Sequence, residues 1–337
     1  MKAAVIGSGG WGTALALVLM ENGHDVTLWC RRPALRELME GTRENPHLKG
    51  VILPEKLVLT DDLNHISGCE AVVLAVPSFA VRETARRIAP HLKPGSVLIL
   101  VSKGIEKGTS LLLHQVVEQE VQGHPVVVLS GPSHAEEIAR GVPTTVVASS
   151  KDRASAEYIQ EILGNETLRI YVNDDITGVE LGGALKNIIA LCAGICDGMG
   201  LGDNAKAALM TRGLAEIGRL GVAMGAKHET FAGLTGVGDL IVTCTSMHSR
   251  NRRAGILIGQ GLSAEEAADR VGMVVEGIHA AKAAYQLAKK MKVEMPIVEQ
   301  LYQVICEGQD VRLALKNLMG RAQRHEDEKV WLEALKK

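Results

Sequence analysis

The first twelve residues constrain the fold most strongly. An apolar run, KAAVI at residues 2–6, leads directly into GSGGWG at residues 7–12, where Gly7, Gly9 and Gly12 form a G-x-G-x-x-G pattern. A strand that turns sharply into a helix uses such glycines for the turn, for close approach to a pyrophosphate and for packing of helix against strand. The helix N-terminus then offers N–H groups and a positive dipole end to phosphates. This opening predicts a dinucleotide-binding βαβ unit of the Rossmann type.

The residues after the second predicted strand bear on the choice of nucleotide. The run DVTLWC at residues 25–30 ends in Arg31 and Arg32. In this fold the ribose of the adenosine is contacted about 20 residues beyond the glycines. An acidic residue there would bind the 2′-hydroxyl of NAD, whereas arginine matches the 2′-phosphate of NADP in charge and geometry. Arg31 and Arg32 therefore favour NADPH, the alternative being an ordinary solvated loop.

Composition excludes several other classes of protein. At 337 residues the chain exceeds the usual size of one core, so two domains are expected. The formal net charge of −2 and the aromatic content of 3% argue against a nucleic-acid partner. No signal peptide precedes the first strand and no apolar run is judged long enough to span a membrane, so a cytoplasmic protein is expected. The six cysteines and eleven histidines show no metal-binding spacing, so no metal is expected.

The order of predicted elements gives the fold class. Short apolar runs at 71–76, 96–101, 126–129 and 144–148 alternate with helical runs, which is typical of an α/β protein. We predict a doubly wound, mostly parallel sheet over residues 1–179 and an all-helical C-terminal domain over 180–337, the second domain binding substrate. Ligands of such sheets bind outside the carboxyl ends of the strands. The glycine loop, Arg31, Pro77, Lys103 and residues 131–133 should therefore lie on one rim.

Two lysines are candidates for chemistry. Lys103 follows a hydrophobic strand on this rim, and Lys186 lies inside an otherwise apolar helix. Burial beside apolar neighbours lowers the pKa of a lysine toward the range useful for proton transfer. The alternative is that Lys186 extends along the helix surface to reach water.

Two polar segments in the helical half complete the candidates. Asp239 is the lone acid of a glycine-rich loop at 233–245, where it could pair with an active-site lysine or cap a helix. Ser249, Arg250 and Asn251 precede or begin a helix, an arrangement that suits a phosphate. The alternative for these residues is a solvated basic surface.

Together these motifs resemble the bacterial NAD(P)-dependent sn-glycerol-3-phosphate dehydrogenase family over nearly the whole chain. The matching segments are GSGGWGTALA (7–16), VSKGIE (101–106), SGPSHAEE (130–137), ELGGALKNIIALCAGICDG (180–198), LMTRGLAEIGRLG (209–221), GLTGVGDLIVTCTSMHSRNRR (233–253), VVEG (274–277) and EMPIVE (294–299).

The resemblance implies reversible reduction of dihydroxyacetone phosphate by NADPH or NADH to sn-glycerol 3-phosphate, which supplies glycerophospholipid synthesis. It implies that Lys186 exchanges the proton at the carbonyl oxygen. The implied substrate contacts are Lys103, Gly131, Ser133, Lys186, Asp239, Ser249, Arg250 and Asn251. The implied cofactor contacts, together with the glycines of the loop, are Gly10, Trp11, Arg31, Arg32, Lys103, Ala135, Arg250, Val274 and Glu276. A homodimer is also considered.

The sequence departs from the family at one position and leaves two alternative functions. The family often carries serine where this chain has Gly10, so a side-chain hydroxyl is missing there while the backbone N–H remains. Hydroxyacid and 6-phosphogluconate-type dehydrogenases have the same architecture, but their signatures do not stand at 180–198 and 233–253. A non-catalytic NADP(H) sensor would keep the glycine loop and Arg31 but would not need Lys103, Lys186 and Asp239 together.

Overall fold

The computed structural model describes residues 1–323 and 326 of the chain. It divides into two compact units: the first comprises Met1–Lys103 and Leu111–Ile176, and the second comprises Gly104–Ser110 and the chain from Thr177 onward. The sequence pattern predicts a boundary after residue 179 and assigns residues 104–110 to the first domain, whereas in the structure the boundary follows Ile176 and residues 104–110 belong to the second unit. The C-terminal limit predicted for the second domain, residue 337, lies outside the described residues.

The first unit contains one eight-stranded sheet in the order β3-β2-β1-β4-β5-β6-β7-β8. All neighbouring strands are parallel except β6 and β7, which are antiparallel. The strands are β1 (Lys2–Ile6), β2 (Asp25–Trp29), β3 (Val58–Thr60), β4 (Ala71–Leu74), β5 (Val97–Leu100), β6 (Val126–Ser130), β7 (Thr144–Ser149) and β8 (Leu168–Asn173). The predicted fold class, a mostly parallel sheet of the Rossmann type, is confirmed.

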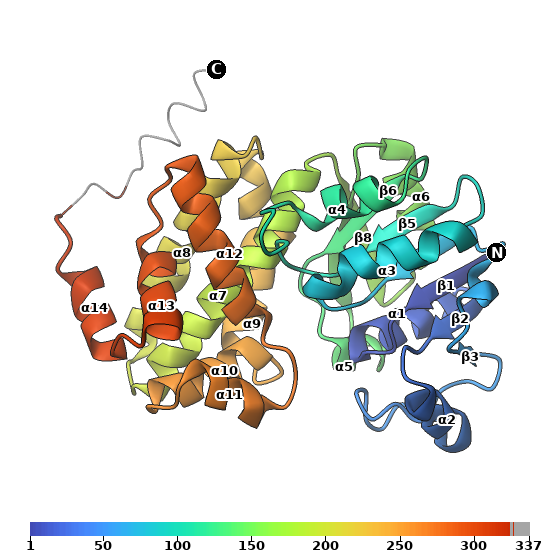
Figure 1. The fold of residues 1–337 in the computed structure, drawn as a ribbon, viewed down its shortest axis with the longest axis horizontal. Helices are drawn as coiled ribbons and strands as arrows, with labels where there is room; N and C mark the ends of the chain where they lie inside the picture. The colour runs from blue at the N-terminus through green and yellow to red at the C-terminus, as the bar shows by residue number, and fades with distance from the viewer. Residues whose placement is uncertain (324–325, 327–337) are drawn as a thin grey trace. The chain divides into compact units, whose positions relative to one another are not determined.

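Helices cover both faces of this sheet (Figure 1). Helices α3 and α4 pack against each other, whereas α1 contacts α5 and α6. The helices of the first unit are α1 (Gly10–Glu21), α2 (Pro33–Thr42), α3 (Val81–Ile88), α4 (Leu113–Glu120), α5 (Ala135–Ile138) and α6 (Arg153–Leu163). The central strands are buried on both faces, as is usual in βαβ sheets. All four residues of β4 and all four residues of β5 are buried.

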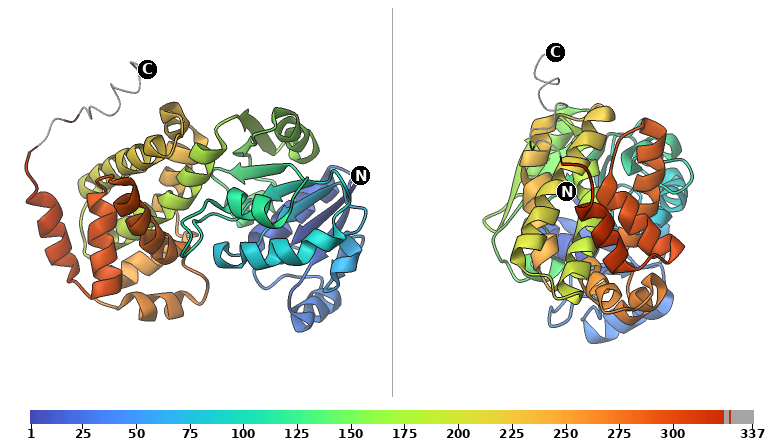
Figure 2. Two further views of the ribbon diagram at one scale, coloured as in Figure 1. Left: turned by 45° about the horizontal axis from the view of Figure 1, so that its top comes forward. Right: turned by 90° about the vertical axis from the view of Figure 1, so that its left-hand side faces the viewer.

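The second unit is helical in the part that the structure describes (Figure 2). Its helices are α7 (Ile176–Gly198), α8 (Asp203–Ala223), α9 (Asp239–Thr245), α10 (Arg250–Gly259), α11 (Ala264–Val271), α12 (Glu276–Met291), α13 (Pro296–Glu307) and α14 (Val311–Met319), α7 beginning with the last residue of the first unit. The expectation of a loop at 233–245 is wrong over residues 234–245, which are helical. A π-helical turn, Leu234–Gly238, runs into α9, so Asp239 begins a helix.

Helix α7 is the core helix of this unit. It is long and apolar enough to cross a membrane, contrary to the expectation that no run reaches that length, but 89% of its most apolar window is buried inside the protein. A buried core helix of a water-soluble domain passes the same length test. Among the described residues, no other helix passes it.

Glycines let α7 and α10 touch backbone to backbone. A Cβ at Gly194 would lie 2.1 Å from the carbonyl oxygen of Arg252, and one at Gly255 would lie 2.1 Å from that of Leu191. Gly198 and Gly259 face the partner helix equally closely. Gly194 and Gly198 on α7 form one G-x-x-x-G pattern, and Gly255 and Gly259 on α10 form another. These two patterns set the helix axes at a spacing that no larger side chain permits.

We therefore expect Gly194→Ala to destabilise the protein by about 1–3 kcal/mol, because the new methyl group must push two backbones apart. The measurement is urea unfolding followed by circular dichroism. Gly41→Ala is the matched control, since its Cβ would meet nothing within 4 Å on an exposed helix. Equal midpoints for Gly194→Ala and the control would contradict the close contact.

Helix α13 is anchored by a buried carboxyl group. Glu216 of α8 is 2% exposed and accepts hydrogen bonds from the backbone N–H groups of Ile297 (2.7 Å) and Val298 (3.3 Å) in the first turn of α13. Burial raises the pKa of Glu216 to about 7, although these two hydrogen bonds act in the opposite direction. The folded protein therefore holds this proton more tightly than the unfolded chain does.

Because the pKa of Glu216 is raised on folding, its contribution to stability is fully present below pH 4.5 and is lost as the pH rises through about 7. The expected loss is of the order of 3 kcal/mol between pH 4 and pH 8. Unfolding free energies of the wild type and Glu216→Gln across this range provide the measurement. Glutamine does not titrate, so the variant should lack this part of the pH dependence. Identical slopes for both proteins would rule the assignment out.

Candidate active site

The glycine loop has the geometry of a phosphate-binding turn. Gly7 has φ +120°, and a Cβ there would lie 2.3 Å from the carbonyl oxygen of Ala75, so only glycine fits. A Cβ at Gly12 would lie 2.1 Å from the carbonyl oxygen of Gly7, which closes helix α1 tightly onto the loop. Gly9 caps α1 without a side-chain hydrogen bond, and a Cβ there would meet nothing within 4 Å. The N-terminus of α1 therefore has open space in front of it.

Position 10 explains the departure from the family pattern. A Cβ at Gly10 would lie 2.8 Å from the carbonyl oxygen of His47 and 3.5 Å from the Cβ of Ala135. The segment around His47 is held by Asn45, which is fully buried and donates to the carbonyl oxygen of Ser8 (3.0 Å). This loop leaves no room for a serine side chain, and the structure brings Gly10 and Ala135 together.

Asn45 is a residue that the sequence analysis missed. Its Nδ2 also donates to Thr13 Oγ1 (2.7 Å) and its Oδ1 accepts from the N–H of His47 (2.9 Å). Its only sequence signal is the Asn-Pro pair at 45–46, which indicates a turn and not a contact with the glycine loop.

Three further predicted cofactor residues lie in the loop or follow the neighbouring strand. Trp11, in the first turn of α1, is half-buried, and its Nε1 is buried with no hydrogen-bond partner among the described residues. Arg31 and Arg32 follow β2, whose last residue pairs with the last residue of β1. Their side chains are exposed and have no ion-pair partner within the described part of the chain. An unpaired donor and two exposed guanidinium groups beside a helix N-terminus suit an anionic ligand.

Lys103, Gly131 and Ser133 form a polar cluster at the carboxyl ends of β5 and β6. The Nζ of Lys103 donates to the carbonyl oxygen of Gly131 (3.0 Å) and lies 3.4 Å from Ser133 Oγ, which itself donates to Gly131 (2.9 Å). Gly131 has φ +130°, a conformation that other residues rarely adopt. Because β1, β2, β4, β5 and β6 are parallel, this cluster, the glycine loop and Arg31 share one edge of the sheet, as predicted from strand order.

In the second unit, Lys186 and Asp239 form a buried ion pair. Lys186 is 6% exposed and Asp239 is 1% exposed, and the Nζ of Lys186 donates to Asp239 Oδ1. The Nζ also donates to Thr243 Oγ1 (2.7 Å), whose own proton goes to the carbonyl oxygen of Asp239 (2.6 Å). The alternative of a lysine extending to water is wrong for this residue. The carboxylate compensates the buried positive charge, which would otherwise be costly.

Thr243 was not singled out from the sequence. It lies four residues after Asp239, so both face the same side of α9 once that segment is helical. Under the expectation of a loop at 233–245, Asp239 and Thr243 would not share a helix face. Thr243 contacts Lys186 only because residues 239–245 are helical.

The residues at the start of α10 are tied to α7 and α12. Asn251 Nδ2 donates to Asn187 Oδ1 (2.9 Å), and Asn251 Oδ1 accepts from the N–H of Gly277 (2.8 Å). Ser249 caps α10 by accepting from the N–H of Arg252 (3.2 Å). The half-buried Val274 and Glu276 lie just before and at the start of α12, next to Gly277. The structure therefore brings Ser249, Asn251 and the segment 274–277 together.

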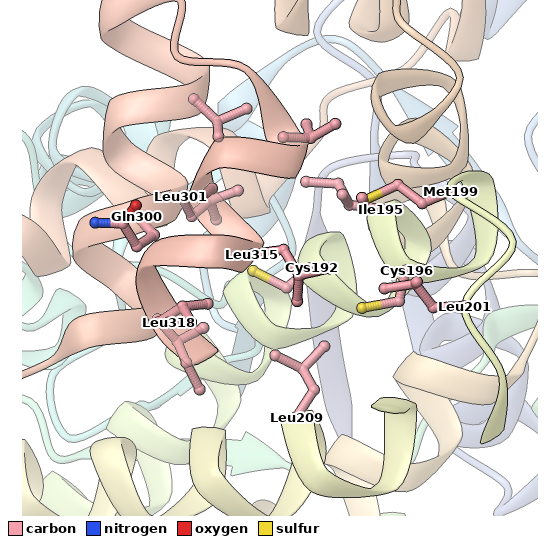
Figure 3. A pocket seen from close by; sticks show the side chains of 14 residues that line it. Cys192, Ile195, Cys196, Met199, Leu201, Leu209, Gln300, Leu301, Leu315 and Leu318 are labelled. Carbon is pink, nitrogen blue, oxygen red and sulfur yellow. The ribbon is translucent and has the colours of Figure 1, made fainter. Parts of the chain in front are cut away.

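An apolar cavity elsewhere in the second unit is not part of this site. Its volume is about 70 Å³, and it lies between α7, α8, α13 and α14 (Figure 3). Cys192 and Cys196 point into it among aliphatic side chains, and burial raises the pKa of both thiols. An apolar lining with neutral thiols cannot compensate a phosphate group.

The cysteines and histidines do not form a metal centre in the described residues, where no group of three or more His, Cys, Asp or Glu could hold an ion. Four of the six cysteines are buried, Cys196 is half-buried and Cys306 is exposed.

Family models match both halves of the chain. Residues 2–156 match the N-terminal model of NAD-dependent glycerol-3-phosphate dehydrogenase, and residues 175–316 match the C-terminal model of the same enzyme.

Individual relatives agree with these models. The chain is 52% identical over 335 residues to a glycerol-3-phosphate dehydrogenase (NAD(P)+) of Desulfitobacterium hafniense, covering 99% of this chain and 95% of that protein. It is 55% identical to the protein of the same name from Moorella thermoacetica, covering 96% and 97%. The crystal structure of glycerol-3-phosphate dehydrogenase from Coxiella burnetii superposes with a TM-score of 0.92 at 40% identity, covering 95% of this chain and 99% of that one. The chain therefore belongs to the NAD(P)-dependent glycerol-3-phosphate dehydrogenase family.

Proposed function

We propose that this protein reduces dihydroxyacetone phosphate to sn-glycerol 3-phosphate with NADPH or NADH, in a reversible reaction. The observation that carries the proposal is the buried cluster of Lys186, Asp239 and Thr243, because reduction of a ketone needs a proton donor held in a fixed position. Family membership supports the same reaction.

The first unit is proposed to bind the nucleotide. The open space before Gly9 and the unpartnered Nε1 of Trp11 fit a pyrophosphate at the N-terminus of α1. The bound nucleotide supplies a hydride to the substrate carbonyl carbon. The proposed contacts are Gly7, Gly9, Gly10, Trp11, Gly12, Arg31, Arg32, Lys103 and Ala135, joined by Arg250, Val274 and Glu276 of the second unit.

Lys186 is proposed to give a proton to the carbonyl oxygen. As the carbonyl carbon gains a hydride, negative charge develops on its oxygen, and an ammonium group stabilises that charge before transferring the proton. Asp239 and Thr243 fix the Nζ of Lys186 through two hydrogen bonds, so its position does not depend on the substrate. Lys186 then regains its proton from water.

The remaining proposed contacts hold the rest of the substrate. The start of α10 would bind the phosphate, because Arg250 and the N–H groups of a helix N-terminus both favour an anion. Asn251 uses its side-chain amide to link Asn187 and Gly277, so we assign it mainly to orienting this turn. Lys103, with Gly131 and Ser133, would bind substrate beside the nicotinamide.

We extend the proposal to the setting of the enzyme. The first unit binds the cofactor and the second binds the substrate, the protein works in the cytoplasm, and it forms a homodimer. Its product supplies glycerophospholipid synthesis. Size-exclusion chromatography with light scattering tests the dimer.

We expect Lys186→Met to lower kcat for dihydroxyacetone phosphate by about 10²–10⁴-fold, because the proton donor is lost while the volume of the side chain is kept. Initial rates of NADPH and NADH oxidation provide the measurement. Fluorescence titration with NADPH is the control, since nucleotide affinity should stay unchanged.

A wild-type protein that binds NADPH but turns over with neither nucleotide would overturn the proposed function and favour a sensor or a hydroxyacid dehydrogenase. Wild-type turnover that survives in Lys186→Met would overturn only the role of the lysine.

The double variant Arg31→Ala/Arg32→Ala should raise the Kd for NADPH about tenfold or more and leave the Kd for NADH nearly unchanged, because only NADPH carries the 2′-phosphate. Arg153→Ala is the matched control: Arg153 is an exposed arginine of the same unit that pairs with Glu157. A parallel loss of affinity for both nucleotides would contradict this preference for NADPH.

A further inference from the structure

A cluster of three charged residues lies at the far end of α7 from Lys186. Asp197 Oδ2 accepts from Arg252 Nε at 2.8 Å, and Asp197 Oδ1 lies 2.6 Å from the Nζ of Lys206. The three side chains are between 15% and 17% exposed, so water screens them only in part. Asp197 lies eleven residues after Lys186 in the chain, about 16 Å along a helix, and cannot touch the reacting atoms itself.

Arg252 connects this carboxylate to two segments of the proposed active site. Its Nη1 donates to the carbonyl oxygen of Thr245 (2.6 Å), the last residue of the helix that carries Asp239. Its backbone N–H donates to Ser249 Oγ (3.2 Å), which caps the helix that begins with Arg250. The side chain and the backbone N–H of Arg252 thus link the end of α7, the end of α9 and the start of α10.

The charges at the start of α10 require such a partner. Arg250, Arg252 and Arg253 lie in its first turn, which contains no acidic residue. Positive charges near a helix N-terminus oppose the helix dipole and repel one another. Burial alone would raise the pKa of Asp197, but hydrogen bonds from Lys206 and Arg252 outweigh it and lower the pKa. Asp197 is therefore a permanent anion beside this turn.

We propose that Asp197, acting through Arg252, is a positioning residue that holds Ser249, Arg250 and Asn251 in the geometry that binds the substrate phosphate. This inference rests on the proposed function. The proposal requires arginine at position 252, because two nitrogens of its guanidinium group donate hydrogen bonds to Asp197 and to Thr245 at the same time. The single ammonium nitrogen of a lysine would reach only one of these two acceptors.

Lys206 provides a matched control within the same cluster. It pairs with the other oxygen of the same carboxylate, but it comes from α8, which carries none of the proposed site residues. Loss of Lys206 should therefore cost stability without moving the start of α10.

The experiment compares Arg252→Lys, Asp197→Asn and Lys206→Met in the full-length protein with dihydroxyacetone phosphate and NADPH. For Arg252→Lys and Asp197→Asn we expect KM for dihydroxyacetone phosphate to rise about tenfold, with kcat within about threefold of wild type and KM for NADPH unchanged. Lys206→Met should keep the wild-type KM. The double variant Asp197→Asn/Arg252→Lys should be no worse than the more affected single variant, because both changes break one link.

An unchanged KM for dihydroxyacetone phosphate in Arg252→Lys and Asp197→Asn would overturn the proposal, and so would an equal rise in Lys206→Met. Should Arg252→Lys fail to fold, Asp197→Asn, which has the same shape, decides alone. Absence of wild-type turnover in the same assay would instead show that the proposed function is wrong, since the variants are read only against an active wild type.

Discussion

The second unit depends on the direct contact between the backbones of α7 and α10. Four glycines remove the side chains that would separate the two helices, and carbonyl oxygens of one helix lie where a Cβ of the other would have to be. Lys186 is on α7, and Arg250 and Asn251 begin α10, so this contact determines the spacing between the proposed proton donor and the proposed phosphate-binding turn. Packed interiors transmit small displacements because they contain little free volume. A site that needs precise placement is thus supported by a helix contact that has little room to yield.

The first unit achieves a similar precision by different means. Strands β1, β2, β4, β5 and β6 are parallel, and β4, β5 and β6 are buried on both faces, so the loops at their carboxyl ends start from fixed positions. Gly7 and Gly131 both adopt positive φ at these ends, which turns the chain at once and keeps the loops short. Backbone groups of these loops then lie at the edge of the sheet beside the side chains of Lys103 and Arg31. Such an edge suits a phosphate-rich ligand, whose oxygens accept from N–H groups.

Much of the fold, and part of the candidate site, could be predicted from the sequence. The glycine loop, the alternation of strands and helices and the change to helices near residue 180 are local patterns, and each is set by residues close together in the chain. The pairing of Lys186 with Asp239 could only be suggested, because the two residues are 53 positions apart. Asn45, Thr243 and Asp197 were missed for the same reason: their partners lie in other elements or become neighbours only once a helix forms. Glycine-rich sequence at 233–238 hid a π-helical turn, since glycine is typical of loops.

The contact between Gly10 and the carbonyl oxygen of His47 links two regions that are far apart in the sequence. A larger residue at position 10 fits only if the segment at 45–47 moves away, and that segment is held by the buried Asn45. A larger residue at position 10 is unfavourable without movement of the segment at 45–47, and that movement is unfavourable without the larger residue. The two regions are therefore expected to differ together among relatives. A member of the family that carries serine at position 10 should thus have a differently built loop after α2, and grafting the serine alone into this chain would not reproduce that relative's binding site.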